Sequence, residues 1–331
     1  MLRKVGGCDI ILQDFCRNKE RLSDVKKVGI LFVLLAGSLW GLMGLFVRWL
    51  SAHGFTSLQV ASIRLTVAAV AMLAFTLVYN RSLLKFKLKD AWLFVVLGVF
   101  SMLMMTVLYF YAINASSMSI AAILLYTAPI FVMVASVIFF KEKITWQKIA
   151  ALVLAFSGCV FISSGGESNV TVYGSMLAVG SGICYASYSI FSTVALRKGY
   201  HPFTVTTFAF CFAAVASYFV ANPIETLSQV VESQSRDVMT VPFVILLGIV
   251  TAVAPFMLYT QSLKWIETGE AAIMASVEPL VASVAGYIAF KEKPGIFGIG
   301  LILLAVLLVN NFGIAEKQPQ PSKCEEQAES L

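Results

Sequence analysis

Charged and metal-binding side chains are scarce in this sequence of 331 residues. Lys, Arg, Asp and Glu make up 13% of the chain, about half of the roughly 25% typical of soluble domains. The two histidines, His53 and His201, are in predicted loops, and the six cysteines form no CxxC pair and no Cys/His cluster of zinc spacing. We therefore expect neither a disulfide framework nor a metal site.

Motifs of ATP-driven and metal-dependent chemistry are also missing. The chain has no GxxxxGK[ST] phosphate loop and no HExxH motif, and no aspartate falls inside a predicted apolar span. The chain therefore has no motif that could bind ATP and drive pumping. It also lacks the general base, the nucleophile or the metal ligands that a membrane hydrolase needs. The sequence therefore predicts a protein that is not an enzyme and needs no cofactor.

Apolar side chains dominate the chain instead. They make up 59% of the residues, against the 45 to 50% or so of soluble proteins, and the mean hydropathy is +0.86. Such a composition is typical of a polytopic membrane protein. The formal charge of +6 does not indicate nucleic-acid binding, because the lysines and arginines lie between apolar spans and not on one folded face.

Ten apolar segments approach or exceed the roughly 20 residues that cross a bilayer. They cover residues 28–50, 57–79, 91–113, 117–140, 146–164, 173–196, 202–221, 241–263, 268–290 and 294–313. Residues 1–27 are interpreted as a cytoplasmic leader without ordered structure, since they lack the apolar core and cleavage site of a secretory signal. Residues 222–238 are expected to be a polar external loop, and residues 314–331 a cytoplasmic tail.

An internal repeat relates the two halves of the chain. Residues 121–143 and 271–293 share many apolar positions, one proline and a terminal Lys-Glu-Lys at a constant offset of 150 residues. The same offset carries Leu97-Gly98 onto Leu247-Gly248. Apolar composition alone does not produce a shared proline and a shared charged terminus in one register, so the sequence predicts a tandem repeat.

The distribution of basic residues predicts how the chain is oriented. With the amino terminus inside, nineteen lysines and arginines face the cytoplasm, four face outward, and Arg64 lies in a span. This asymmetry places both termini in the cytoplasm. Because five helices is an odd number, the second half enters the membrane from the opposite side. The predicted fold is thus an all-α polytopic membrane protein with ten transmembrane helices in two inverted five-helix repeats, residues 28–165 and 173–313.

Several stretches resemble a known family. Residues 127–162, residues 275–309 and the Leu39-Trp40-Gly41 triplet are similar to EamA-type members of the drug/metabolite transporter superfamily. This resemblance covers roughly residues 28–313. It implies a central cavity formed mainly by helices 1, 3, 4, 6, 8 and 9, with helices 5 and 10 at the periphery, and a protein that transports small molecules. It does not identify the substrate.

Glu278 is the strongest candidate for a coupling or binding group. It lies about ten residues into the ninth span, about 15 Å along a helix and so near the midplane. A carboxylate there costs about 2.5 to 3.5 kcal/mol, and it should face a cavity or a partner. The alternatives are proton coupling or binding of an amino group, and a structural acid that caps backbone freed by Pro279.

Arg64 is the second mid-span charge, about seven residues into the second span. It is either structural or substrate-binding, and a pair with Glu278 is one hypothesis. Pro129 and Pro279 occupy matched positions in their spans, where they either break helices at a substrate site or introduce simple kinks. Six aromatic residues within inner spans are candidates for the cavity wall or for packing in the bundle: Trp40, Tyr109, Tyr126, Tyr185, Tyr188 and Tyr259.

The sequence thus predicts a secondary active transporter in the plasma membrane. It is expected to export amino acids or other small metabolites or drugs by alternating access, with protons as the candidate coupling ion, as a monomer or a homodimer. The rival interpretation is a flippase of a lipid-linked or amphipathic substrate. The partners expected are a small-molecule substrate and the lipid bilayer, with no nucleic acid.

Overall fold

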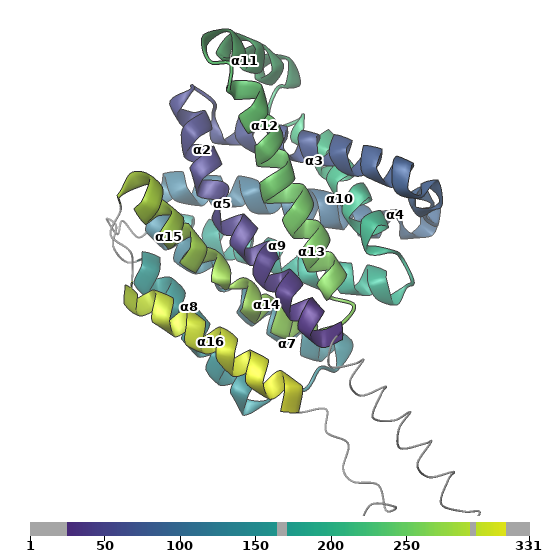
Figure 1. Ribbon diagram of the computed structural model, residues 1–331, viewed down its shortest axis with the longest axis vertical. Coiled ribbons are helices and arrows are strands. Elements are labelled where there is room, and N and C mark those ends of the chain that lie inside the picture. The colour runs from purple at the N-terminus through teal and green to yellow at the C-terminus, as the bar shows by residue number, and fades with distance from the viewer. Residues whose placement is uncertain (1–24, 164–170, 292–295, 316–331) are drawn as a thin grey trace, which may run out of the picture.

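The computed structural model describes residues 25–163, 171–291 and 296–315, and all regular elements in these ranges are helices (Figure 1). Eight helices in this part of the chain are long and apolar enough to cross a membrane. Two shorter apolar helices, Pro202–Ser217 and Ile296–Val309, lie where the seventh and tenth spans are expected. The count of ten spans and their inverted arrangement remain predictions. Most of the expected leader and tail, residues 1–24 and 316–331, lies outside the described residues.

The helices follow the predicted segments closely. A helix of residues 25–41 passes through a turn at Leu42. The first half then contains α2 (Met43–Ala52), α3 (Ser57–Tyr79), α4 (Ala91–Val95), η3 (Val96–Met104), α5 (Met105–Ala115), α6 (Met118–Leu125), α7 (Ala128–Phe140) and α8 (Trp146–Ser163). The second half contains α9 (Val172–Arg197), α10 (Pro202–Ser217), α11 (Pro223–Arg236), α12 (Thr240–Gly248), η4 (Ile249–Val253), α13 (Ala254–Ser262), α14 (Thr268–Ala275), α15 (Val277–Phe290) and α16 (Ile296–Ala315).

Two of the expected spans are each divided into two helical segments. The span of residues 117–140 is interrupted between α6 and α7, and the span of residues 268–290 between α14 and α15. Pro129 and Pro279 each lie in the first turn of the second segment. A proline is tolerated there because the first backbone N–H groups of a helix have no intrahelical acceptor. The matched prolines therefore lie at matched helix starts.

The third and eighth spans are irregular at matched places. The segments η3 and η4 are both π-helical, and the 150-residue offset of the repeat places them over one another. Short π-helical segments widen a helix locally and are frequent at functional sites. The two halves thus share a backbone irregularity as well as a sequence pattern.

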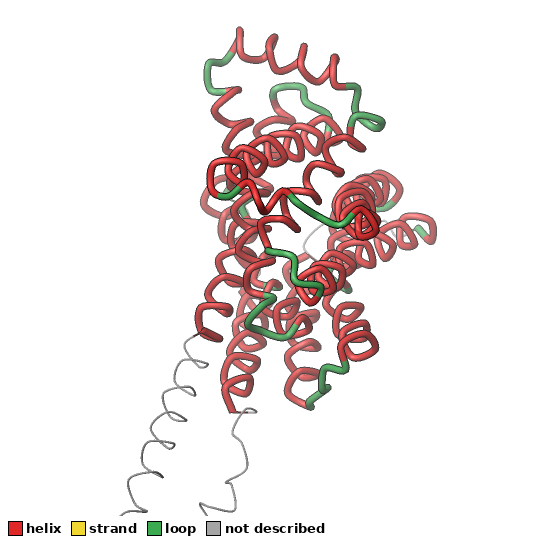
Figure 2. The backbone as a smooth tube through the Cα atoms, turned by 90° about the vertical axis from the view of Figure 1, so that its right-hand side faces the viewer, coloured by secondary structure: helices red, strands yellow, loops and turns green. Residues whose placement is uncertain are grey.

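Residues 222–238 are not a loop, so the prediction for this segment was wrong. They contain the helix α11, which crosses the top of the molecule in Figures 1 and 2. Asn222 caps its start by accepting from the Ile224 N–H at 3.0 Å, and Pro223 occupies the first turn. Asn and Pro at these positions are common signals of a helix start. The overall polarity of the segment concealed them.

Close contacts between helices fix the frame around the interior. Helices α8 and α16 lie side by side at one edge of the molecule (Figure 1). A Cβ added to Gly158 or to Gly298 would lie 2.8 or 2.5 Å from the carbonyl oxygen of the other glycine, so only glycine permits this approach. At the opposite edge, α3 and α10 are joined by a hydrogen bond between the buried Thr76 and Thr207 hydroxyls, 2.9 Å apart.

Candidate functional site

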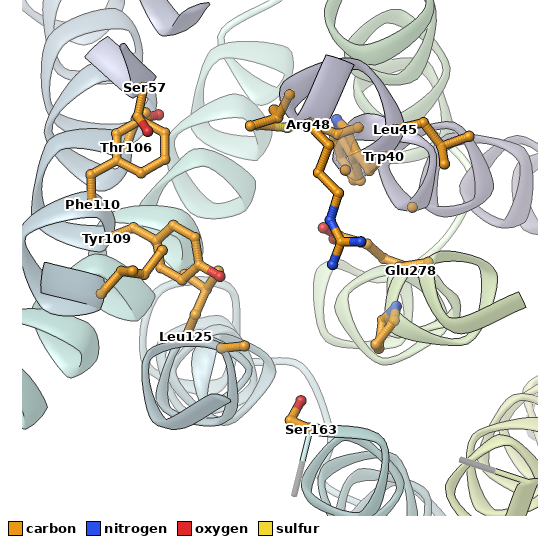
Figure 3. A pocket seen from close by; sticks show the side chains of 18 of the residues that line it. Trp40, Leu45, Arg48, Ser57, Thr106, Tyr109, Phe110, Leu125, Ser163 and Glu278 are labelled. Atoms are coloured by element: carbon orange, nitrogen blue, oxygen red, sulfur yellow. The ribbon is translucent and has the colours of Figure 1, made fainter. Parts of the chain in front are cut away.

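A cavity of about 950 Å³ lies between the two predicted halves. Figure 3 shows Thr106, Tyr109 and Phe110 on one side of it, and Trp40, Arg48 and Glu278 on the other. The lining continues to exposed residues at the ends of α2, α3 and α15, among them Ser51 and Phe290. We call this the open end of the molecule, defined by Ser51, Ser57 and Phe290. The cavity is large enough for a small organic solute.

Glu278 owes its place to the break between α14 and α15. It lies in the first turn of α15, where the unpaired N–H groups and the helix dipole favour a negative charge. The Tyr185 hydroxyl donates toward its Oε2 over a long 3.4 Å. A Cβ on Gly41 would lie 2.6 Å from the Glu278 carbonyl oxygen. The helix of residues 25–41 therefore packs directly against the turn that carries the carboxylate.

Arg64 also lines the cavity, although its residue surface is only 4% exposed. Its Nη1 donates to the Met43 sulfur at 2.8 Å, and its buried Nε has no hydrogen-bond partner. Both residues are among those described, and no Arg64 nitrogen lies within 4.0 Å of a Glu278 oxygen. The hypothesised direct pair is therefore not formed in this structure. Arg64 keeps hydrogen-bonding capacity beside the cavity, since thioether sulfur is a weak acceptor.

The six aromatic candidates separate into two layers. Trp40, Tyr109, Tyr126 and Tyr185 line the cavity, whereas Tyr188 and Tyr259 are not part of its wall. The Trp40 ring packs on Phe256 and Tyr259 at centroid distances of 5.1 and 5.4 Å. The Tyr188 hydroxyl bonds Thr260 at 2.7 Å, and the Tyr259 hydroxyl bonds Ser189 at 2.8 Å. This second layer forms a floor beneath Trp40.

Beyond the floor, a group of charged side chains closes the other end of the molecule. Glu142 accepts from the backbone N–H groups of Thr268 and Gly269 at 2.9 and 3.1 Å, and so caps α14. Lys148 pairs with Glu267, and the buried Glu270 pairs with Lys26 at 3.1 Å. We call this set the charged end. It ties the first helix, the α7–α8 connection and α14 together.

Some residues of the site were not identified from the sequence. Arg48 lines the cavity with its guanidinium carbon 4.5 Å from the Phe290 ring centroid, although the charge distribution only counted it among the four basic residues on the external side. Its spacing of four and eight residues from Gly44 and Trp40 puts all three on one helix face, and this was the missed signal. Glu142 was interpreted as part of a charged helix end, and only the folded chain brings it to α14.

The cavity draws on more helices than the family resemblance implies. Besides helices 1, 3, 4, 6, 8 and 9, the lining includes Arg64 and Ser57 of α3 and Ser163 of α8. Pro279 lines the cavity as well, whereas Pro129 is buried outside its wall. Among the described residues, no group of three or more His, Cys, Asp or Glu side chains is placed to hold a metal ion. The cavity lining thus offers one carboxylate, two guanidinium groups, the Asn114 amide, hydroxyls, methionine sulfurs and aromatic faces.

Comparison with known proteins shows a family match over both halves of the chain. The model of the EamA-like transporter family matches residues 27–164 and again residues 172–311. An uncharacterized transporter of Archaeoglobus fulgidus is 27% identical over 279 residues, covering 83% of this chain and 96% of the relative. The uncharacterized transporter YwfM of Bacillus subtilis is 25% identical, with 85% and 93% covered.

A solved structure described only as the crystal structure of a protein has the same fold. It superposes with a TM-score of 0.71 at 16% identity, over 88% of this chain and 99% of its own. At this identity the similarity concerns the fold and not the substrate. The matches extend over almost all of the described helices.

Proposed function

This chain belongs to the EamA-like transporter family, and on that premise we propose that it is a secondary active transporter that carries a small organic solute through the central cavity by alternating access. It is a multi-pass membrane transporter. The observation that carries the finer proposal is the cavity itself, which is open to the surface at one end and separated from the charged end by the aromatic floor. A site that is open to one side of the membrane and closed to the other is what alternating access requires.

The proposed orientation follows from the basic residues. With both termini in the cytoplasm, the charged end faces inward and the open end outward. The structure then corresponds to an outward-open state, held by Glu142 on α14 and by the Lys148–Glu267 and Lys26–Glu270 pairs. Opening toward the cytoplasm would break these contacts and part the floor beneath Trp40.

The cavity chemistry favours a substrate with charged groups of both signs. Glu278 can pair with an ammonium group, and Arg64 and Arg48 can bind a carboxylate. The aromatic wall of Trp40, Tyr109 and Tyr185 suits an apolar body. Amino acids and related metabolites meet these requirements, and we propose their export as the physiological direction. Glu278 would exchange a proton for the substrate ammonium, which couples export to the proton gradient.

The test is flux in proteoliposomes. Pooled labelled amino acids and small metabolites are offered to the full-length protein with and without an imposed pH gradient, and a fluorescent lipid is offered in parallel vesicles. Saturable solute flux that responds to the gradient supports the proposal. Transfer of lipid between leaflets without solute flux would replace it with the flippase, a function that fits the exposed Tyr111 and Phe290 in the cavity wall.

A further inference from the structure

Helix α11 presents three chemically different faces. Thr226 and Ser233 are buried against the molecule. Ile224, Leu227 and Val231, spaced by three and four residues, are exposed and form an apolar stripe. Glu225, Glu232 and Arg236, spaced by seven and four residues, are exposed on a separate side. The solvent-accessible part of this helix thus has an apolar side and a charged side, with the exposed Ser228 and Ser235 between them.

Exposed apolar side chains also lie at both ends of α11, on the neighbouring helices. Phe219, just beyond the end of α10, is 88% exposed, and Val215 on α10 is exposed as well. On the other side, Val238 and Ile245 carry the exposed apolar surface from the end of α11 onto α12. Since α10 and α12 belong to the bundle of a membrane protein, we expect their exposed apolar side chains to meet lipid near both ends of α11.

The inner face of α11 is fastened to the cavity rim. Gln229 donates to the His53 carbonyl oxygen at 3.1 Å, and the His53 Nε2 lies 3.2 Å from Asp237. Val230 packs against the cluster that contains Leu50 and Phe55. These attachments fix the rotation of α11 about its axis, so the direction of the stripe is set by the fold.

We propose that α11 is an interfacial helix whose stripe of Ile224, Leu227 and Val231 lies in the bilayer leaflet at the open end, with Glu225, Glu232 and Arg236 in water. Figure 2 shows the helix lying across the end of the molecule, an arrangement that suits a membrane surface. A separate charged face beside an apolar one is the property that places helices in the interface plane. Through the contacts of α11 with His53, Leu50 and Phe55, this lipid contact holds the open end of the cavity at a fixed depth relative to the bilayer.

Thiol reactivity tests the proposal in the full-length protein. Leu227→Cys and Val231→Cys are compared with Glu225→Cys and Glu232→Cys in phosphatidylcholine nanodiscs that hold one copy each, using a water-soluble maleimide. Labelling of the native cysteines is measured in the wild type and subtracted. Because the reactive thiolate forms in water, the stripe positions should react at least about tenfold more slowly than the polar positions.

Two outcomes would overturn the proposal. Equally fast labelling at all four positions would place the stripe in water. Fast labelling at 227 and 231 in single-copy nanodiscs, but slow labelling in densely packed vesicles, would mean that a second copy covers the stripe.

As an independent measurement, a nitroxide on Leu227→Cys should collide more with oxygen than with a nickel chelate, and one on Glu232→Cys should show the reverse; the same preference at both positions would also contradict the proposal.

Discussion

The two charged residues Glu278 and Arg64 in the cavity differ in how many hydrogen-bond partners the protein gives them. The Glu278 carboxylate lies at the N-terminus of α15 and accepts a long hydrogen bond from the Tyr185 hydroxyl. Arg64 is almost fully buried; its Nη1 donates to the Met43 sulfur, and its Nε has no hydrogen-bond partner. A buried cation with so little hydrogen bonding is costly for folding. If Arg64 binds a ligand, this cost has a functional reason, and that possibility can be tested.

Arg64→Gln distinguishes the two roles of this arginine. If Arg64 binds a substrate carboxylate, the variant should raise KM about tenfold or more, in keeping with the loss of a charged hydrogen bond of about 1.5 to 3 kcal/mol. Its thermal stability should not fall, because a poorly satisfied buried cation has been removed. The measurements are flux kinetics and thermal unfolding in detergent. A normal KM with a large fall in Tm would show a structural role.

His201, which lies outside the spans, gives a pH prediction. Its ring Nδ1 accepts from the Phe203 N–H at 3.3 Å and caps α10, and burial, followed by repulsion from Lys264, lowers the pKa of His201 below 6.5. The unfolded chain therefore binds the proton more readily, and stability should be lost as the pH falls below about 6.5.

The matched control for His201 is His201→Asn, which keeps a capping oxygen but does not titrate. Melting curves between about pH 7 and pH 5 should show a smaller loss in the variant than in the wild type, by up to about 1 kcal/mol. Identical pH profiles would exclude His201 as the origin of the loss.

At the scale of elements, the two interrupted spans carry the site. The break before α15 brings Glu278 to a helix start, and the break before α7 lies at the matched place. The π-helical segments η3 and η4 add a second matched pair. Matched irregularities in two halves are the feature that marks transporter sites.

Gly41 tests how tightly the first helix holds α15. Gly41→Ala should destabilise the protein by about 1 to 3 kcal/mol through overpacking against the Glu278 carbonyl, and it should impair transport. Gly44→Ala is the matched control, because nothing lies within 4 Å of a Cβ at that position. Melting temperatures of both variants check the destabilisation, and flux is measured for Gly41→Ala alone, because Gly44 lines the cavity. Equal effects at the two positions would mean that the close approach at Gly41 is unimportant.

Glu142 tests the cap on α14. In Glu142→Ala the Thr268 and Gly269 N–H groups lose their acceptor, and their hydrogen exchange should accelerate about fivefold, as expected for the loss of a cap of about 1 kcal/mol. Glu225→Ala, on the exposed side of α11, should leave these two amides unchanged. The cap would be refuted if exchange at Thr268 and Gly269 did not respond to Glu142.

The sequence predicted most elements but fewer of the contacts. The lengths of the apolar segments predicted both ends of α3 correctly and the ends of the other spans to within a few residues. Helix α11 was missed because its apolar stripe has only three members in a polar segment. The pairing of Glu142 with α14 could not be predicted, since it joins residues 126 apart through packing that no local pattern encodes.

At the scale of the whole molecule, one side of the cavity is open and the other is closed in two layers. The aromatic floor beneath Trp40 lies nearest the cavity, and the charged end lies beyond it. A movement that closes the open end must release both layers if the solute is to leave on the other side. Net transport against a gradient then depends on whether Glu278 carries a proton in one direction and substrate in the other.

The most direct test separates exchange from coupled transport in Glu278→Gln. Proteoliposomes with substrate on both sides measure exchange, and an imposed pH gradient measures net accumulation. If Glu278 couples the proton, the wild type should show both activities, whereas Glu278→Gln should keep measurable exchange and lose accumulation. Accumulation by Glu278→Gln at the wild-type level would contradict the central claim that this carboxylate couples transport.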